Sequence, residues 1–483
     1  MSTPLTLHPD RDSTPERRPI ARRSTHRAPP SRARLAWLAL LFLVALGGFA
    51  WPGIELARDL ADPALGAPGI PRRALSLERD LTPRFADWAE ARVESGAAAH
   101  APLHDVPTTE WPMFSAVFYL MGTRALTEAA ARGEISRDAL GDEAERLRAI
   151  TAARALLLDP VHHSWVRTHW GEGYLHRENV FFRSLLIGGL TADVAMTNDV
   201  SARAVLRNQT DSLADDLDRS ALGLLNDYPG ECYPIDVLAA VGWIRRADAV
   251  LGTDHGAFAS RAIRAFEGDN ADHLGLPRFR VDLPSGREVQ PSRGIGTSWS
   301  LLFAPDLWPD RAPRWYATYD HHFFRDHGWA AGFREYEEGT EAEWTFEIDA
   351  GPVIDGFGTA ASAFGIAAAR RNGRFDHAYT LSSELAAASW ALPDGRLVLP
   401  RLASHAIDAP YLGESALLYF LTVEPAPGVP IVRGGHAPPC VWLAFLVYFG
   451  LPLGLALVLA RELRAHRAAS RSRQESASVA TTS

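Results

Sequence analysis

The chain has 483 residues, 47% of them hydrophobic, which is enough for a large packed core and excludes a disordered or fibrous protein. All 49 basic residues are arginine, so a Schiff-base lysine and the lysine of a phosphate-binding loop are both excluded. The formal net charge is −9, and the two cysteines, Cys232 and Cys440, predict no disulfide within the main domain.

A basic tail and an apolar segment begin the chain. Residues 1–34 are rich in Arg, Pro and Ser and predict a disordered tail. The segment Leu35–Trp51 has 17 residues without a charge, the short limit for crossing a bilayer, and we predict a transmembrane helix over residues 35–54. A cleaved signal peptide is the alternative, because residues 48–50 resemble a cleavage site, although the long leader favours an anchor.

A second apolar segment lies near the other end. Val441–Ala460 has 20 uncharged residues and predicts a transmembrane helix over residues 438–460, followed by a basic tail over 461–483. Arginines flank both apolar segments on the terminal side, so the positive-inside rule predicts cytoplasmic termini and a periplasmic or extracellular main domain in a cell membrane. The arginine-only, alanine-rich composition indicates a bacterial coding bias.

The charge of the main domain limits its partners. The two tails carry net charges of +5 and +3, which leaves −17 for the remainder of the chain. An acidic domain is a poor partner for nucleic acid, so we predict none. The predicted partners are the lipid bilayer, through two transmembrane helices, and a small-molecule substrate, with an oligomer left open.

Between the apolar segments the pattern is mainly helical. Residues 55–110 predict a proline-rich linker, extending through Pro83, and one helix near 84–94. From Trp111 to residue 430 we predict an all-α domain whose paired helices form a toroid. The predicted helices begin at Trp111 and cover residues 136–158, 178–196, 199–222, 234–251, 255–266, 296–302, 313–327, 356–371, 374–391 and 413–421. A small β-hairpin is predicted over Arg278–Val289.

Five segments resemble the linalool dehydratase/isomerase family. The resemblance is carried by FSAVFYLMGTRAL from Phe114, WGEGYLHRENVFF from Trp170, DYPGECYPID from Asp227, GIGTSWSLLF from Gly294 and DGFGTAASAF from Asp355. They lie within residues 111–385. The resemblance implies an (α/α)6 barrel and lyase or isomerase chemistry on a small hydroxylated or alkene-bearing substrate.

The chain departs from that family at its functional positions. The family's cavity uses a tyrosine, a histidine and two cysteines, and the matching positions here hold Phe114, Leu185, Asp227 and Asp236. The acid–base set is therefore not retained. The resemblance supports the fold more strongly than the activity, because function belongs to sites and not to folds.

The segment Asp227–Asp236 is the predicted catalytic loop. It holds three carboxylates, two tyrosines and a thiol in ten residues, and two carboxylates can divide into an acid and a base where burial and repulsion separate their pKa values. The predicted catalytic residues are Asp227, Asp236, Glu178 and Tyr233. The alternative for Asp236 is a capping role, since it falls in the first turn of the helix that begins at Pro234.

Aromatic and polar side chains of the same segments predict the substrate-binding surface. The residues are Phe114, Tyr119, Trp170, Tyr174, Phe181, Leu185, Tyr228, Glu231, Cys232 and Asp355. We interpret Cys232 as a buried residue without a catalytic role rather than as a nucleophile, because no base or cation lies near it in the sequence. No cofactor and no metal site is predicted; His322 and Asp326 have helical i,i+4 spacing, yet solvated side chains explain them better.

Three functions are compatible with these observations. The first is a membrane-anchored lyase or isomerase with carboxylate and tyrosine acid–base chemistry. The second is a carbohydrate-active enzyme, because paired carboxylates with Trp and Tyr walls suit sugars. The third is a non-catalytic exported binding domain. An apolar enclosed cavity favours the first, an open cleft with opposed carboxylates the second, and scattered carboxylates the third.

Overall fold

The computed structural model describes residues 30–340 and 343–481, and it is mostly helical, as predicted. It divides into two compact units. One unit comprises residues 44–453, and the other comprises the described residues before 44 together with those after 453. Each unit is described by itself.

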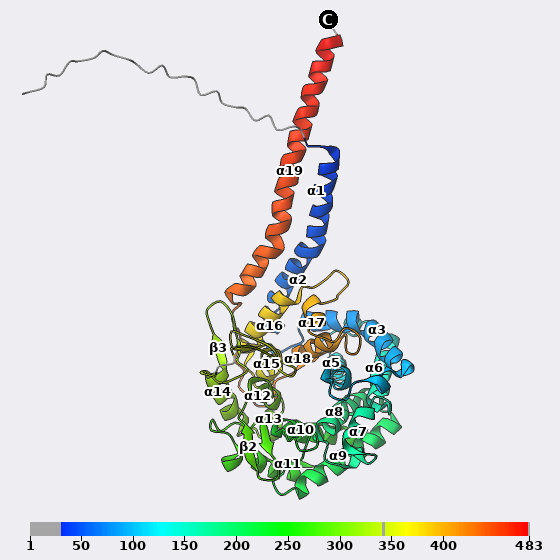
Figure 1. The fold of residues 1–483 in the computed structure, drawn as a ribbon, viewed down its shortest axis with the longest axis vertical. Helices are drawn as coiled ribbons and strands as arrows, with labels where there is room; N and C mark the ends of the chain where they lie inside the picture. Colours follow the sequence, from blue (N-terminus) through cyan, green and yellow to red (C-terminus); the bar gives the residue numbers. More distant parts are fainter. Residues whose placement is uncertain (1–29, 341–342, 482–483) are drawn as a thin grey trace, which may run out of the picture. The chain divides into compact units, whose positions relative to one another are not determined.

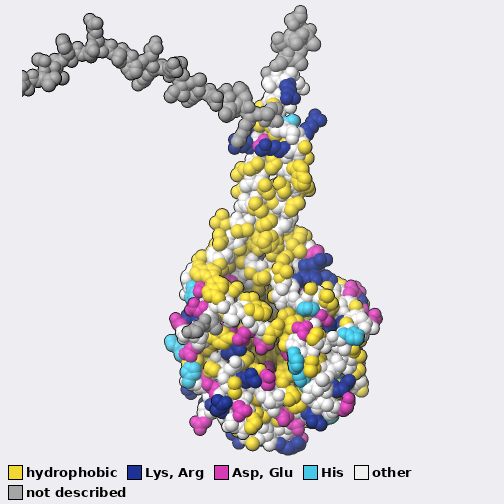
Figure 2. Space-filling view, viewed as in Figure 1, with side chains coloured by type: hydrophobic (Ala, Val, Ile, Leu, Met, Phe, Trp, Pro, Cys, Tyr) yellow, Lys and Arg dark blue, Asp and Glu magenta, His cyan; other side chains and the backbone are white. Residues whose placement is uncertain are grey.

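In the described part of the chain, three helices are long and apolar enough to cross a membrane: Arg32–Leu60, Val180–Thr197 and Pro439–Gln474. The most apolar stretch of the second is 83% buried inside the protein, whereas those of the first and third are only 17% and 11% buried. The side chains of the first and third therefore face outward, and these helices are yellow along much of their length in Figure 2.

The first of these helices is longer than predicted. It consists of α1 (Arg32–Ala45), a π-helical turn (Leu46–Ala50) and α2 (Trp51–Leu60). Pro52 does not end it, because a proline in the first turn of a helix removes no internal hydrogen bond, and the π-helical turn comes directly before. The other, α19 (Pro439–Thr481), contains Pro452.

Within residues 44–453, six helices contact one another in chain order, and the last contacts the first (Figure 1). They are α5 (Trp111–Ala131), α8 (Val180–Thr197), α10 (Pro234–Leu251), α12 (Gly294–Leu301), α15 (Thr359–Arg371) and α18 (Leu412–Thr422). We call them the inner helices. Every side chain of α8 from Val180 to Val194 is buried, as expected of a helix that is apolar on all sides.

Other helices, each with one buried face, pack outside them. They are α3 (Arg72–Ser95), α6 (Glu143–Leu158), α9 (Val200–Arg219), α14 (Ala312–Phe323) and α16 (Phe375–Ser389). In α9, for example, Leu206, Leu213 and Leu217 are buried on one face. Shorter helices are α4 (Val106–Thr109), α7 (Ser164–Trp170), α11 (Gly256–Ala262), α13 (Ala304–Leu307) and α17 (Val398–Leu402).

The predicted linker through Pro83 is wrong. Helix α3 begins at Arg72 and has Pro83 inside it, flanked by the fully buried Leu81 and Phe85. An internal proline costs a helix about 3 kcal/mol, and the burial of two large side chains is of comparable size. Tertiary packing therefore keeps the helix continuous.

Short antiparallel strands occur between the helices. Strands β1 (Arg280–Asp282) and β2 (Arg287–Gln290) confirm the predicted hairpin. Five further strands were not predicted: β3 (Phe324–Asp326), β4 (Ala331–Phe333), β5 (Trp344–Glu347), β6 (Gly351–Ile354) and β7 (Phe357–Gly358). Because β3 begins at Phe324, the helix predicted to reach residue 327 ends at Phe323.

Candidate functional site

The loops before the inner helices α5, α8, α10 and α12 meet at one end of the ring. The Val180 N–H at the start of α8 donates to the Asn226 carbonyl, 3.2 Å away, in the loop before α10. The loop before α5 reaches the same place, because the Tyr228 hydroxyl donates to Glu110. In Figure 2 the surface is hollowed near the middle of the ring, with acidic side chains close to the hollow.

Asp227 is a buried carboxyl at the centre of this region. It is 1% exposed, and its Oδ2 accepts a hydrogen bond of 2.7 Å from the Tyr233 N–H. Burial raises its pKa well above the usual range, and the Asp236 charge raises it further, against the lowering effect of the Tyr233 and Phe181 N–H groups. Its Oδ1 has no hydrogen-bond partner within 3.5 Å among the described residues. Burial and the Asp236 charge therefore both favour the protonated form of Asp227.

Asp236 lies in the first turn of α10 and is half-buried. Burial raises its pKa to about 7, and the Asp349 charge adds to this rise, while the Trp299 indole N–H lowers it. Among the described residues, no side chain caps the start of α10, where Tyr233 is the N-cap. Asp236 thus interacts with a neighbouring inner helix, and part of it is open to solvent.

Glu110 is a site carboxyl that the sequence analysis missed. It precedes α5, is half-buried, and accepts a hydrogen bond from the Tyr228 hydroxyl. Burial raises its pKa to about 8; the Tyr228 hydrogen bond lowers it, and the charges of Asp349 and Asp236 raise it. Its position in the sequence could have indicated this role, because Glu110 stands just before a helix with proline in its first turn, as Tyr233 does.

Aromatic rings surround these carboxyl groups. The Phe181 ring lies 5.5 Å from that of Phe114 and 6.1 Å from that of Tyr228, centroid to centroid. Trp299, whose indole faces Asp236, lies 5.5 Å from Phe364. Phe114, Tyr228 and Phe364 are only partly buried. The carboxyl groups therefore face an apolar, electron-rich surface.

A buried ion pair supports one side of the site. Arg293, just before α12, donates from Nε to Glu335 at 2.8 Å and also binds Glu347 in β5. Its guanidinium lies over the rings of Phe279 and Tyr336, 4.5 and 4.9 Å from their centroids. This pairing holds strand β5 against the start of α12.

The other predicted catalytic residues lie close to the carboxyl pair. Glu178 accepts a 2.8 Å hydrogen bond from the Asn226 N–H, which ties the loops before α8 and α10 together. The Tyr233 hydroxyl donates to Glu231 at 2.7 Å. Cys232 is fully buried, and burial together with the charges of Asp227, Glu178 and Asp236 raises its pKa, so it is a thiol at neutral pH.

Several predicted binding residues point elsewhere. The Tyr119 hydroxyl lies 3.0 Å from that of Thr82 in α3, and its ring stacks on Phe85, so it faces the outer helices. The Tyr174 hydroxyl lies 2.9 Å from His163 Nδ1. Asp355 pairs with His327 at 3.1 Å. The structure therefore does not bring these three side chains to Asp227 and Asp236.

Two other predicted binding residues belong to packing. Leu185 is 1% exposed, one turn after Phe181 in α8, and lies in the main core. Trp170, the last residue of α7, packs on the same core. Their positions give them no polar contact with the carboxyl group of Asp236 in the described part of the chain.

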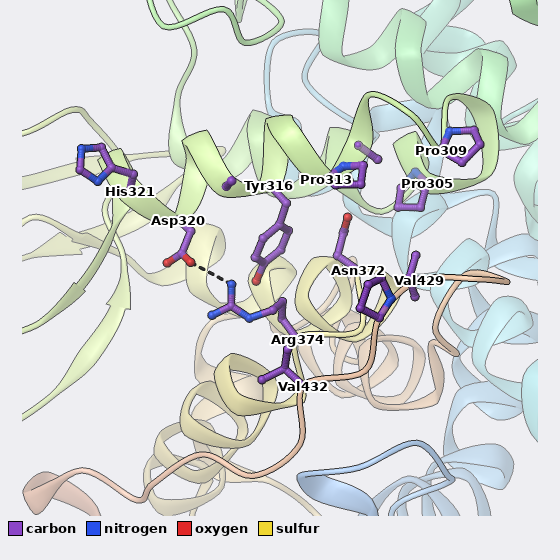
Figure 3. Close-up of a pocket in the computed structure, with 13 residues that line it drawn as sticks. Pro305, Pro309, Pro313, Tyr316, Asp320, His321, Asn372, Arg374, Val429 and Val432 are labelled. Carbon is purple, nitrogen blue, oxygen red and sulfur yellow. Dashed lines mark hydrogen bonds and ion pairs between the residues drawn. The ribbon is translucent and has the colours of Figure 1, made fainter.

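A cavity of about 450 Å³ lies away from these residues, between α14 and residues 429–432 (Figure 3). Proline rings and Tyr316 line it, and Arg374 pairs with Asp320 across it at 2.9 Å. Near its edge, His322 pairs with Glu337 at 3.5 Å. In residues 30–340 and 343–481, no three His, Cys, Asp or Glu side chains gather in a way that could hold a metal ion.

No protein-family model matches this chain, and no match was found among curated proteins. The geometry of the site therefore carries the functional conclusion. What the site offers is two half-buried carboxyl groups, Asp236 and Glu110, that exchange protons near neutral pH beside aromatic rings. Such a pair can protonate one position of a bound molecule and deprotonate another.

Proposed function

We propose that this protein is a membrane-anchored lyase or isomerase, similar to the linalool dehydratase/isomerase family, that acts on a small hydroxylated or alkene-bearing substrate. The fold proposed is an (α/α)6 barrel joined to two transmembrane helices. In support, the six inner helices contact one another in a closed order, with other helices packed outside them. The resemblance of residues 111–385 supports the same fold.

The proposed chemistry is removal of water from an alcohol. Glu110, protonated below pH 8, donates its proton to the hydroxyl group as the C–O bond breaks. Asp236, ionised above pH 7, takes a proton from the adjacent carbon, and the electrons of that C–H bond form the alkene. The products are one alkene and one water molecule. Allylic isomerisation uses the same groups, with water returning at another carbon.

One observation carries this proposal: two titrating carboxyl groups each contact an aromatic side chain, Glu110 that of Tyr228 and Asp236 that of Trp299. Such rings stabilise the positive charge that develops on carbon as a hydroxyl group leaves. The buried Asp227 is the positioning member, since it fixes the turn through the Tyr233 N–H.

The test is turnover by the purified full-length protein in detergent. Tertiary and allylic alcohols of five to fifteen carbons are supplied, and alkene and rearranged alcohol are measured by gas chromatography. We expect Asp236→Asn to reduce turnover by about 10²- to 10⁴-fold, the usual contribution of a general acid or base. The matched control is Asp215→Asn, an aspartate 69% exposed on α9, which we expect to leave turnover within about twofold.

The carbohydrate alternative rests on the same carboxyl groups and on the Trp299 and Tyr228 rings. Aryl glycosides supplied in the same assay separate the two functions. Release of the aryl group by wild type, lost in Asp236→Asn, would favour the glycosidase. Alcohols and glycosides that all remain unchanged would favour a non-catalytic binding domain.

A further inference from the structure

The hairpin formed by β5 and β6 exposes one apolar face. Trp344 is 71% exposed, Phe346 68% and Ile354 43%. Trp344 pairs with Ile354 and Phe346 with Pro352, so these four side chains share one side of the hairpin. Exposed aromatic and branched side chains grouped in this way mark an interaction surface.

The opposite face of the hairpin is fixed to the domain. Glu347, which alternates with Phe346 and so points the other way, binds Arg293 and accepts a hydrogen bond from the Tyr336 hydroxyl. Val353 is 2% exposed on the same side. The apolar face is therefore presented outward by a rigid support.

The exposed face continues toward the start of α19. The Trp329 carbonyl accepts a 2.9 Å hydrogen bond from the Cys440 N–H, and Trp329 itself is 50% exposed. In the same turn, Asp326 pairs with His436 at 3.2 Å. His327 pairs with Asp355, which connects this turn to the end of β6. The hairpin and the membrane-spanning helix thus share one local structure within residues 44–453.

A second group of exposed apolar side chains lies on the side of the ring where α2 attaches. Leu402 is 76% exposed and Ile407 77%, in and just after α17. Helix α17 contacts α16, which contacts α2. Figure 1 shows β3 and α17 on the side of the ring where α2 attaches. We call Trp329, Trp344, Phe346, Ile354, Leu402 and Ile407 the apolar collar.

We propose that the apolar collar lies in the interfacial layer of the lipid bilayer, so that the helical domain rests on the membrane. Lipid is the partner that the observations favour, because the collar lies beside α2 and the start of α19, the parts of the two outward-facing apolar helices that belong to residues 44–453. Trp and Phe are the side chains that membrane interfaces prefer. This surface is independent of the proposed reaction.

The test is the environment of a probe on the collar of the full-length chain. Phe346→Cys, and separately Leu402→Cys, are made with Cys440→Ser and labelled with an environment-sensitive dye. The protein is reconstituted into vesicles of phosphatidylcholine and phosphatidylglycerol. The matched control is Val200→Cys, a residue 82% exposed at the start of α9. Quenching by spin-labelled lipid is compared with quenching by aqueous iodide.

We expect the lipid quencher to act severalfold more strongly than iodide at 346 and 402, and the reverse order at 200. Iodide quenching at 346 and 402 equal to that at 200 would overturn the proposal. Shielding from both quenchers would overturn it too, since it would indicate a protein covering the collar. Using two collar positions keeps the test decisive if one variant fails to fold.

Discussion

Burial shifts the pKa values of the carboxyl groups in the candidate site more than charge pairing does. Glu110, Asp227 and Asp236 lie close together, and among the described residues no basic side chain is a main influence on their pKa values. Burial and repulsion therefore both favour their protonated forms. The same combination makes them suited to proton transfer near neutral pH and costly to ionise.

Replacing Glu110 by Gln is expected to stabilise the protein at alkaline pH. The pKa of Glu110 is about 8 in the folded protein, whereas its ordinary value is 4.5. Between pH 4.5 and pH 8, Glu110 therefore takes up a proton when the chain folds. The contribution of Glu110 to the free energy of unfolding is complete below pH 4.5 and is lost as the pH rises through 8. Glutamine has no ionisation to suppress. Thermal unfolding in detergent checks this: Tm of Glu110→Gln relative to wild type rises by roughly 1 to 3 °C from pH 5 to pH 8.

Glu172→Gln serves as the control, because its side chain is 92% exposed and we expect no pH-dependent difference. A Tm of Glu110→Gln that falls relative to wild type on going from pH 5 to pH 8 would contradict the raised pKa.

The sequence located part of the site. Asp227 and Asp236 are nine positions apart in one segment rich in carboxyl groups, so the sequence indicated a shared site, and the structure brings them together. Glu110 was missed because Tyr228, its partner, is 118 positions away. Tyr119 was misplaced because a helix pattern does not tell which of two buried faces a side chain occupies, and it faces α3.

At the scale of elements, one buried ion pair joins a strand to an inner helix. Arg293 is 7% exposed and Glu335 0%, and the Arg293 charge lowers a Glu335 pKa that burial raises to about 7. Arg293→Met leaves Glu335 buried and unpaired. We expect a loss of about 3 kcal/mol in the free energy of unfolding, larger at pH 8 than at pH 5, where Glu335 can protonate.

The comparison is Arg325→Met, whose partner Glu338 is 68% exposed; it is expected to cost less than about 1 kcal/mol. Unfolding followed by circular dichroism measures both. Equal losses in the free energy of unfolding for the two variants would show that burial does not make the Arg293–Glu335 pair more important for stability than the exposed pair.

Helices were easier to predict than strands, for a physical reason. The apolar segments that form α5, α8 and α10 extend over 18 residues or more, so each is recognisable on its own. Strands β3 to β7 have two to four residues, and their pairing depends on segments elsewhere in the fold. Pro83 suggested the wrong structure, because α3 stays helical through it by packing against other parts of the fold, which the local sequence does not reveal.

At the scale of the whole molecule, the arginine distribution assigns a side to the domain. Arginines outside both apolar segments favour cytoplasmic ends, so we propose that the helical domain lies in the periplasm or outside the cell. Within the smaller unit, Arg34 pairs with Glu462 at 2.7 Å, which is consistent with both helix ends lying on the same side of the bilayer.

The measurement that tests a membrane-anchored exported enzyme most directly is a pair of reporter fusions in intact cells. One set follows Arg473, and the other replaces everything after Arg433, ahead of α19. We expect a fluorescent protein that folds only in the cytoplasm to be bright after Arg473. We expect alkaline phosphatase, active only outside the cytoplasm, to work after Arg433. Phosphatase activity after Arg473, or fluorescence after Arg433, would place the domain in the cytoplasm and contradict the account.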